Sequence, residues 1–424
     1  MREMKDSGIE WIGEIPLSWE LSKIGALYEE RNIKVSDTDY VPLSVTKKGI
    51  VPQLETAAKT DNGDNRKLIQ KNDFVINSRS DRRGSCGISD YDGSCSLINT
   101  VLKPRKNMCN AYYSFVFHSD LFADEFYAWG NGIVDDLWST KWSSMKRIYI
   151  PAPSMEEQKK IADYLAEKCS KIDKILSKLE LQISKIEEYK KSLISETITQ
   201  GCTSGRDTVE TKIPWIRNIP SNWKVAKLKT LMNVLPGYAF PSDDFSTDNG
   251  IPLLRGINVT PSGIRWDEVV YWDKEIDQKL ETFTLKENDV VMGLDRPWIN
   301  EGTRVTFIKK NDLPSLLLQR VCRIRAIGEN DLRYIYYWLG SDALKQSLEI
   351  ETTGVSVPHI STKQLQNFLI AVPPIEEQKG ICDYLEKKCY VIDKNIHNKR
   401  TIINKLNEYK KSLIYEVVTG KKEV

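Results

Sequence analysis

The chain has 424 residues, which is too long for one ordinary compact domain and indicates two or three. Hydrophobic residues make up 40% and charged residues 28%, a balance typical of a globular protein, and no apolar run approaches the roughly 18 residues that span a bilayer. The net charge of only +2 argues against tight, unassisted binding to nucleic-acid phosphates, but it leaves open binding that is shared with partners.

The first residues, MREMKDSGIEW, lack the apolar stretch of a secretory signal, so we expect a cytoplasmic protein. The eight cysteines are scattered, none forms a C-x-x-C pair, and there are only three histidines. Structural zinc sites need such ligands at close spacing. We therefore predict no metal site and expect reduced, mostly buried thiols.

The chain contains an internal repeat, which is the most informative feature of its sequence. EWIGEIPLSWELSKIGAL at 10–27 matches PWIRNIPSNWKVAKLKTL at 214–231, so that residue 11 corresponds to residue 215, 204 positions later. EEQKKIADYLAEKCSKIDK at 156–174 matches EEQKGICDYLEKKCYVIDK at 376–394, which is 220 positions later. The second match continues without a gap to EYKKSLI at 188–194 and 408–414.

The repeat predicts four consecutive segments. Residues 1–152 and 206–372 form two related domains with mixed strand and helix signals, and residues 153–205 and 373–424 are mainly helical. The polar, glycine-containing stretch QGCTSGRDTVETK, from residue 200, links the first helical segment to the second domain. The expected fold class is α+β, with an internal pseudo-twofold repeat.

Both helical segments carry a coiled-coil pattern. Ser154 is a suitable N-cap for a helix over 156–199, and Gly201 follows its end. Apolar residues recur at alternating spacings of three and four, and lysines interrupt the series at 190, 399 and 410. The pattern includes Leu165, Ile172, Leu176, Leu179, Ile183 and Ile186 in the first copy, and Leu385, Ile392, Ile396, Ile403, Leu406 and Leu413 in the second. Helices of this length are too long to be buried in either domain, so we expect them to pack on each other as an antiparallel pair.

Loops of each domain carry side chains suited to DNA. Arginine and asparagine present donors and acceptors that match guanine and adenine edges, while lysine, serine and threonine commonly contact phosphates. In the first domain the candidates are Thr46, Lys47, Lys48, Asn77, Arg79, Arg82, Arg83 and Lys141. In the second they are Arg255, Asn258, Arg265, Arg296, Trp298, His359, Ser361 and Lys363. Any one of them could be an ordinary solvated surface residue, but equivalent loops carry such residues in both copies.

These features together resemble the specificity subunits of Type I restriction–modification enzymes. The resemblance is carried by EEQKKIADYL and EEQKGICDYL after proline-rich segments, by the W-x3-IP-x2-W pattern that begins each domain, and by the EYKKSLI helix ends. With the repeat order it covers essentially the whole chain. It implies two target-recognition domains separated by two long helices, conserved in that family, that pack as an antiparallel coiled coil. Each domain would read one half of a bipartite, asymmetric DNA sequence, and the helices would set the spacer between the halves.

The resemblance also implies partners. Two methyltransferase subunits would dock on the helices and methylate adenine with S-adenosylmethionine, and restriction subunits would add ATP- and magnesium-dependent cleavage. The chain itself would bind double-stranded DNA, hold no cofactor and have no catalytic residue.

Two other classes of protein were weighed against this one. A self-sufficient methyltransferase or nuclease is disfavoured, because the chain has neither an [ND]-P-P-[FYW] tetrapeptide nor a G-x-x-x-x-G-K-[ST] phosphate loop. A non-catalytic coiled-coil adaptor of another DNA-processing complex stays open as the alternative. It does not explain why the two domains differ so much while the helices stay matched.

Overall fold

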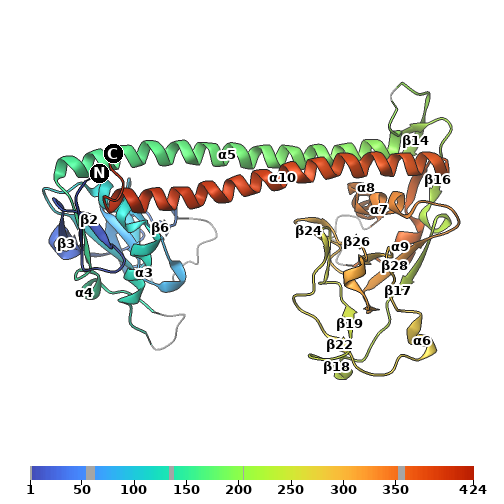
Figure 1. Cartoon of the computed structure of the whole chain (residues 1–424), viewed down its shortest axis with the longest axis horizontal. Helices are drawn as coiled ribbons and strands as arrows, with labels where there is room; N and C mark the ends of the chain where they lie inside the picture. The colour runs from blue at the N-terminus through green and yellow to red at the C-terminus, as the bar shows by residue number, and fades with distance from the viewer. Residues whose placement is uncertain (1, 54–62, 133–137, 204, 352–358) are drawn as a thin grey trace. The chain divides into compact units, whose positions relative to one another are not determined.

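The computed structural model describes the whole chain except residues 1, 54–62, 133–137, 204 and 352–358. It consists of two compact units (Figure 1). Unit 1 comprises Met1–Leu181 together with Lys399–Val424, and unit 2 comprises Gln182–Asn398. Each unit therefore contains one domain and segments of both long helices, α5 (Met155–Gln200) and α10 (Ile375–Val418).

The start and end of α5 follow from the local sequence. The Ser154 hydroxyl accepts a hydrogen bond from the backbone N–H of Glu157 at 3.3 Å, as expected of an N-cap. Glu156 and Glu157 occupy the first turn, where the helix dipole favours negative charge. The helix ends before Gly201, whose φ of 79° is a conformation that glycine adopts without strain. The helix predicted over 156–199 is thus confirmed.

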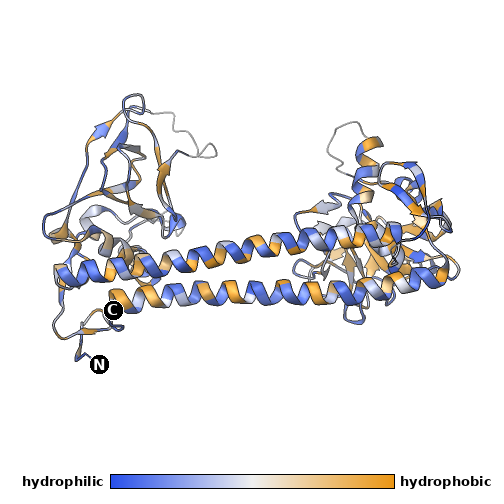
Figure 2. Ribbon diagram, turned by 90° about the horizontal axis from the view of Figure 1, so that it is seen from above, coloured by the Kyte–Doolittle hydropathy of each residue, from blue (hydrophilic) through white to orange (hydrophobic). Residues whose placement is uncertain are grey.

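In each unit the segments of α5 and α10 pack together along the predicted apolar series. In unit 1, Leu165 and Ile172 of α5 belong to the same core as Leu413 of α10. In unit 2, the core joins Ile198 of α5 to Leu385 of α10. Apolar residues accordingly recur along both helices between hydrophilic ones (Figure 2). The other members, Leu176, Leu179, Ile183, Ile186, Ile392, Ile396, Ile403 and Leu406, are buried or half-buried. The expected pairing of the two helices is confirmed.

Two lysines that interrupt the apolar series form ion pairs with the opposite helix. In unit 2, Lys190 Nζ donates to both carboxylate oxygens of Asp393, at 2.7 and 2.8 Å. In unit 1, Lys410 Nζ makes the same pair of bonds to Asp173, at 2.6 and 2.8 Å. Residues 190 and 410 occupy equivalent places in the repeat, as do 173 and 393. The two copies of the helix therefore pair reciprocally, with the same contact formed once in each unit.

The domain of unit 1 is built on an antiparallel four-stranded sheet in the order β10-β9-β12-β4 (Cys86–Ile88, Phe74–Asn77, Asn99–Pro104, Tyr28–Glu30). A three-stranded sheet, β11-β8-β5 (Gly93–Cys95, Arg66–Ile69, Lys34–Val35), and the hairpin β6-β7 (Leu43–Thr46, Gly49–Pro52) adjoin it. β13 (Tyr149–Ala152) pairs with β3 (Glu20–Lys23), and β1 (Met4–Asp6) pairs with β2 (Glu14–Pro16). The short helices are α1 (Ile24–Leu27), α2 (Asn110–Phe117), α3 (Asp120–Ala128) and α4 (Trp142–Met145).

The domain of unit 2 repeats this plan. Its main sheet runs β26-β23-β28-β17 (Val305–Phe307, Val290–Gly293, Val321–Ala326, Met232–Pro236), which is the strand order of unit 1. β29 (Leu369–Val372) pairs with β16 (Lys224–Lys227), and β14 (Thr208–Ile213) pairs with β15 (Ile216–Pro220). Short strands form β18-β22-β19-β27 (Phe245–Ser246, Tyr271–Trp272, Ile251–Leu254, Leu316–Leu317), β20-β21 (Val259–Thr260, Gly263–Ile264) and β24-β25 (Trp298–Ile299, Gly302–Thr303). The helices are α6 (Gln278–Glu281), α7 (Leu332–Gly340), α8 (Asp342–Glu351) and α9 (Thr362–Asn367).

The core of each unit joins the main sheet to the long helices. In unit 1, Tyr112 of α2 is fully buried and donates its hydroxyl to the backbone carbonyl of Val418 in α10, at 2.8 Å. In unit 2, Tyr334 of α7 donates to the carbonyls of Ile198 in α5 and Ala371 in β29, at 2.9 and 2.8 Å. The short helices α2 and α7 thus supply core residues and also bind the end of a long helix.

No helix in the described part of the chain is long and apolar enough to cross a membrane. All eight cysteines are unpaired thiols, and only Cys202 is exposed. The expectation of mostly buried thiols is therefore confirmed.

Candidate nucleic-acid interface

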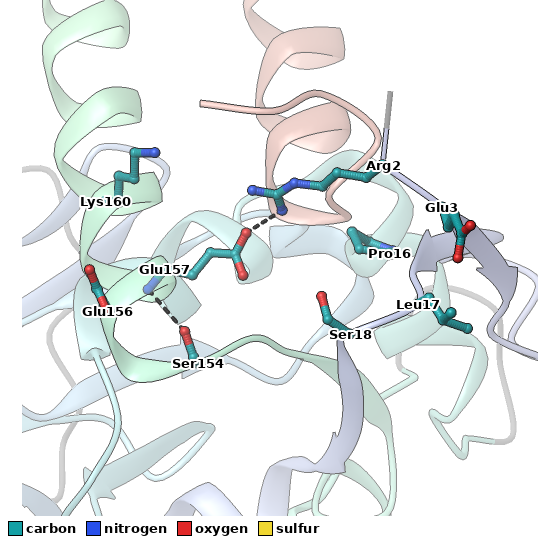
Figure 3. Close-up of a pocket in the computed structure, with 9 residues that line it drawn as sticks. All are labelled: Arg2, Glu3, Pro16, Leu17, Ser18, Ser154, Glu156, Glu157 and Lys160. Carbon is teal, nitrogen blue, oxygen red and sulfur yellow. Dashed lines mark hydrogen bonds and ion pairs between the residues drawn. The ribbon is translucent and has the colours of Figure 1, made fainter.

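Each domain is attached to a long helix by a tryptophan and an arginine that bind one glutamate. In unit 1, the Trp19 indole N–H donates to Glu157 at 2.8 Å, and Arg2 pairs with the same carboxylate. Figure 3 shows Arg2 and Glu157 beside a pocket at the start of α5, where Ser154 caps the helix. In unit 2, Trp223 donates to Glu377 at 3.0 Å, and Arg206 pairs with it. The tryptophan of each W-x3-IP-x2-W pattern thus recognises the second glutamate of each EEQ motif.

The glutamine of each EEQ motif forms a second attachment. Gln158 accepts a hydrogen bond from the backbone N–H of Cys109, and Gln378 accepts one from that of Asp331. Both side-chain amides also donate to the carbonyl of the proline five residues earlier. The repeated motif is therefore explained by structure, because it positions each domain on its helix.

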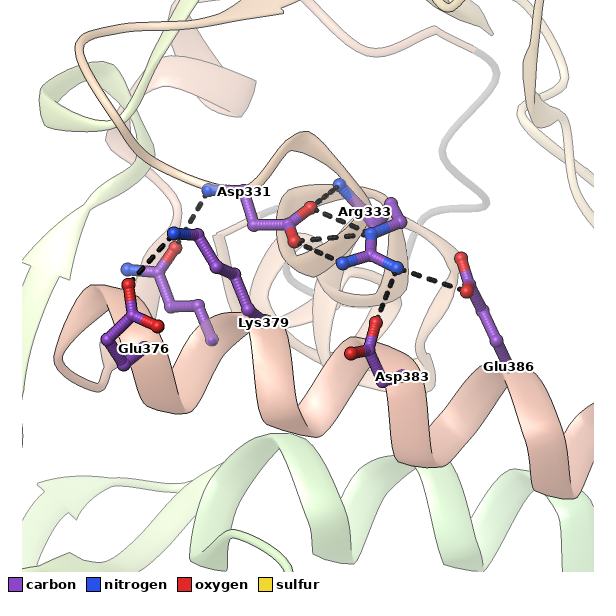
Figure 4. A network of polar contacts seen from close by, with 7 residues as sticks. Asp331, Arg333, Glu376, Lys379, Asp383 and Glu386 are labelled. Atoms are coloured by element: carbon purple, nitrogen blue, oxygen red, sulfur yellow. Dashed lines mark hydrogen bonds and ion pairs between the residues drawn. The ribbon is translucent and has the colours of Figure 1, made fainter.

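Unit 2 adds an ion network at the same place (Figure 4). Arg333, at the start of α7, donates to Asp331 at 2.7 Å and to Asp383 and Glu386 of α10 at 2.8 and 3.0 Å. The hydrogen bonds that Arg333 donates to Asp331 contribute most to raising the pKa of Arg333 above its ordinary value. Burial alone would raise the pKa of Asp331, but hydrogen bonds from Arg333 outweigh burial and lower it. This network stabilises the attachment and leaves other surfaces of the domain to bind a ligand.

The β6-β7 hairpin of unit 1 presents two lysines. The Thr46 hydroxyl donates to the carbonyl of Gly49 at 2.9 Å and accepts from the N–H of Lys48 at 3.1 Å. Thr46 therefore organises the turn, and Lys47 and Lys48 are exposed at its tip.

The basic loop after β9 brings four of the predicted residues together. Asn77 is buried and accepts a hydrogen bond from the backbone N–H of Arg79 at 3.1 Å. Arg79 binds Asp81 through two parallel bonds of 2.9 and 3.1 Å, and Arg82 is largely exposed. Arg83 pairs with Asp124 of α3, and this hydrogen bond raises the pKa of the arginine.

The chain segment before α4 lies beside the basic loop. Ser139 forms an isolated antiparallel bridge with Arg79, and Lys141 is exposed at the start of α4. Residues 133–137, which precede Ser139 in the chain, lie outside the described residues.

In unit 2, the loop after β19 is organised around Asn258, which is 1% exposed. Its amide donates to the carbonyls of Arg265 and Glu268 at 2.8 and 3.2 Å, and its oxygen accepts from the N–H of Arg255 at 3.0 Å. Arg255 bonds to the carbonyl of Glu268, and Arg265 pairs with Glu301 at 3.0 Å. Asn77 and Asn258 both shape their loops, and the arginines beside them are more exposed than these asparagines.

Two residues that sequence reasoning missed meet beside β23: Asp295, in the loop after that strand, and Arg320, just before β28. His359 Nδ1 lies 2.6 Å from one carboxylate oxygen of Asp295, and Arg320 Nη1 donates to the other at 2.5 Å. Burial alone would raise the pKa of Asp295, but hydrogen bonds from His359 and Arg320 outweigh it and lower the pKa. Arg296 is exposed beside them, and Trp298 packs against the core of unit 2.

The remaining predicted residues lie at the start of α9. Ser361 is its N-cap and forms a capping box with Gln364, while Lys363 is exposed. Residues 352–358, which precede His359 in the chain, lie outside the described residues.

No metal-binding arrangement accompanies these loops in the described ranges. Among the described residues, no group of three or more histidine, cysteine, aspartate or glutamate side chains could hold a metal ion. The described cations are instead presented singly or against carboxylates, which suits binding to an anionic polymer.

Comparison with known proteins identifies the class. Residues 16–188 and 220–408 match the model of the Type I restriction modification DNA specificity domain. Two such domains account for most of the chain, which therefore belongs to the family of Type I restriction–modification specificity subunits. Members of this family are non-catalytic DNA-recognition subunits of their complexes.

Among individual relatives, the chain is 30% identical to the Type I restriction enzyme MjaVIII specificity subunit of Methanocaldococcus jannaschii over 277 residues, or 65% of this chain. The chain spans 62% and 28% of the lengths of the first two curated relatives that it matches. A solved structure titled as the basis of complex assembly and conformational transition of the type I R-M system is similar, with a TM-score of 0.73 at 14% identity over 96% of this chain and 99% of that one. The HsdS subunit from Thermoanaerobacter tengcongensis has a TM-score of 0.52 at 16% identity over 96% and 98%. These two structures support the fold of two domains and two paired helices.

Proposed function

We propose that this chain is the DNA specificity subunit of a Type I restriction–modification complex, in which each domain reads one half of a bipartite, asymmetric site. The target-recognition domains are residues 1–152 and 206–372, and the helical segments 153–205 and 373–424 set the length of the unread spacer. Family membership and the internal repeat both support this assignment.

One observation carries the proposal: the two domains share their main sheet and their attachment to the helices, but not their loops. The strand order β10-β9-β12-β4 equals β26-β23-β28-β17, and Trp19–Glu157 equals Trp223–Glu377. The loops that follow corresponding strands differ in length, charge and side-chain chemistry. Two readers of different half-sites on one scaffold need this combination of shared framework and different loops.

We infer that the DNA-facing residues are those predicted from sequence, with the exposed cations as direct contacts. Lys47, Lys48, Arg82, Arg296 and Lys363 extend from the loops and suit phosphate or base-edge contacts. Carboxylates or carbonyls hold five other side chains and so fix their geometry before DNA binds: Arg79, Arg83, Arg255, Arg265 and His359. The loops are shaped by Thr46, Asn77, Asn258 and Ser361, and Trp298 packs against the core of unit 2. Lys141, exposed at the start of α4, would contact DNA directly.

The partners are two methyltransferase subunits docked on the helices, with restriction subunits in the complete enzyme. The repeat supports two equal docking sites, because Tyr189 and Tyr409 are equivalent residues and remain 57% and 50% exposed. An aromatic side chain left this exposed on a long helix is suited to a protein interface. S-adenosylmethionine, ATP and Mg²⁺ would be bound by these partners, and the chain would supply DNA recognition.

The first test is genome-wide mapping of N6-methyladenine in cells with the chain present or deleted and the methyltransferase retained. Loss of methylation at one asymmetric, gapped motif on deletion would support the proposal. Unchanged methylation would contradict it and favour the alternative, a coiled-coil adaptor without DNA specificity.

A second test separates the two domains. Replacing Arg79, Arg82 and Arg83 with alanine should abolish recognition of one half-site and leave the other half of the motif unchanged. Arg105 is the matched control, because it lies far from the basic loop along β12. Asn99, at the start of β12, pairs with Asn77 beside the loop, whereas Arg105 follows the end of the strand. Arg105→Ala should preserve the whole motif. If the triple variant behaves like this control, the basic loop is not a reading element.

A further inference from the structure

Three chain segments meet beyond the central strands of unit 2 through backbone hydrogen bonds. The N–H of Leu294, just after β23, donates to the carbonyl of Arg320, just before β28, at 2.9 Å. The N–H of Ile360 donates to the carbonyl of Leu294 at 2.8 Å. Asp295 and His359 then face each other across an antiparallel bridge. Leu294 and Ile360 are buried, so the junction itself is part of the folded core.

Unit 1 contains the same junction. The N–H of Ser78 donates to the carbonyl of Ile98 at 3.3 Å, and the N–H of Thr140 donates to the carbonyl of Ser78 at 2.9 Å. Arg79 and Ser139 form the corresponding antiparallel bridge. Ser78 and Thr140 are buried as their counterparts are. The backbone arrangement therefore recurs in both domains, although no sequence motif marks it.

The side chains that leave this shared junction differ completely. In unit 2 they are a carboxylate, a guanidinium and an imidazole, from Asp295, Arg320 and His359. At the equivalent positions of unit 1 they are a guanidinium, an aliphatic group and a hydroxyl: Arg79, Ile98 and Ser139. Nothing in the buried framework requires these differences, because the backbone makes the same bonds in both domains.

The side chains of unit 2 are arranged for recognition. The Arg320 and His359 side chains are 70% and 51% exposed, and both are fixed by the less exposed carboxylate of Asp295. Arg320 has a φ of 67° and Arg296 a φ of 44°, which are uncommon conformations for residues with a Cβ. Such backbone strain is concentrated at functional sites, where the surrounding structure maintains it.

We infer that positions 79, 98 and 139 of the first domain, and 295, 320 and 359 of the second, are equivalent specificity-determining positions. The inference rests on the proposed function, and it names where the two half-sites are distinguished. In the second domain the Arg320 guanidinium would read a guanine through its O6 and N7 acceptors, as arginine commonly does in the major groove. Asp295 would be a positioning residue that holds Arg320 and His359 toward the base edges.

The test uses the full chain reconstituted with its methyltransferase partner and a library of DNA sites. Arg320→Ala should relax one guanine position of one half-site, with discrimination there falling about 5- to 140-fold. Arg320→Lys keeps the charge but lacks the planar fork, so it should not restore that discrimination. Alanine has a Cβ as arginine does, so the backbone strain at this position is unchanged. Asp295→Asn should relax the same position while retaining Arg320.

Lys310→Ala is the control, because Lys310 lies beyond Phe307, at the opposite end of the main sheet from Gly293 and the junction. It should change neither half-site. If Arg320→Ala weakens methylation equally at all sequences, or leaves the motif intact, the base-reading role is overturned. If the unaltered chain directs no sequence-specific methylation at all, the proposed function itself fails, and the two failures are distinguishable.

Discussion

The reciprocal ion pairs between the long helices allow a quantitative test of how those helices recognise each other. Replacing Lys190 with glutamate removes its bond to Asp393 and places two negative charges side by side. The pair is partly exposed, with the lysine side chain 28% and the aspartate 56% accessible, so its loss costs about 0.2–1 kcal/mol. Repulsion of similar size brings the expected total to about 0.4–2 kcal/mol. For a unit of roughly 200 residues, this corresponds to a melting temperature about 1–8 °C lower.

Thermal unfolding by calorimetry would measure the shift, and the exchanged pair Lys190→Glu with Asp393→Lys should recover most of it. Lys191→Glu is the matched control: it makes the same change of charge at the adjacent exposed position and should have little effect. High salt should reduce the difference, since it screens exposed charges. Electrostatic pairing of the helices would be refuted if Lys190→Glu lowered the melting temperature no more than Lys191→Glu. It would also be refuted if the double exchange failed to recover the lost stability. The equivalent exchange at Lys410 and Asp173 should give the same result.

Three further outcomes follow from buried groups. The lowered pKa of Asp331 means that its carboxylate stabilises unit 2 above its unfolded pKa of about 4 and loses this effect as the pH falls through the lower folded value. In the Arg333→Met variant, the melting temperature of unit 2 should therefore fall less as the pH is lowered below about 5. Tyr334→Phe leaves two carbonyls without their buried donor and should cost about 1–3 kcal/mol in denaturant unfolding, whereas no loss would contradict a role for the hydroxyl. Because burial raises the pKa of the Cys86 thiol to about 12, a thiol reagent at pH 8 should label Cys202 first and Cys86 only after unfolding, as mass spectrometry would show.

The helices were predictable from sequence because their signals are local and periodic. Ser154 and Gly201 mark the ends of α5, and the three–four spacing of apolar residues identifies the buried face. The internal repeat predicted that the two long helices pack on each other, since two helices with the same apolar series can bury it against one another. Each of these features depends on residues close in sequence or repeated at a constant separation.

The arrangement of the loops was harder to predict from the sequence. Asp295, Arg320 and His359 are far apart in the chain, and only the folded sheet brings them together. Asn258 has the side chain of an adenine reader, but the structure turns its amide inward to bind backbone carbonyls. Sequence indicates which side chains could donate or accept, whereas their direction depends on contacts formed elsewhere in the domain.

The composition of unit 1 has a consequence for how the protein folds as it is synthesised. Its core includes Leu413, Ile414, Val417 and Val418, whereas unit 2 is formed by the single continuous stretch 182–398. At about 5–20 residues per second, roughly 12–46 seconds separate the emergence of residue 181 from that of residue 413. The apolar surface of the first domain that α10 covers in unit 1 therefore stays exposed while the domain of unit 2 is synthesised. Unit 2 can therefore complete its core before unit 1, which is the reverse of the order in which the two domains are translated.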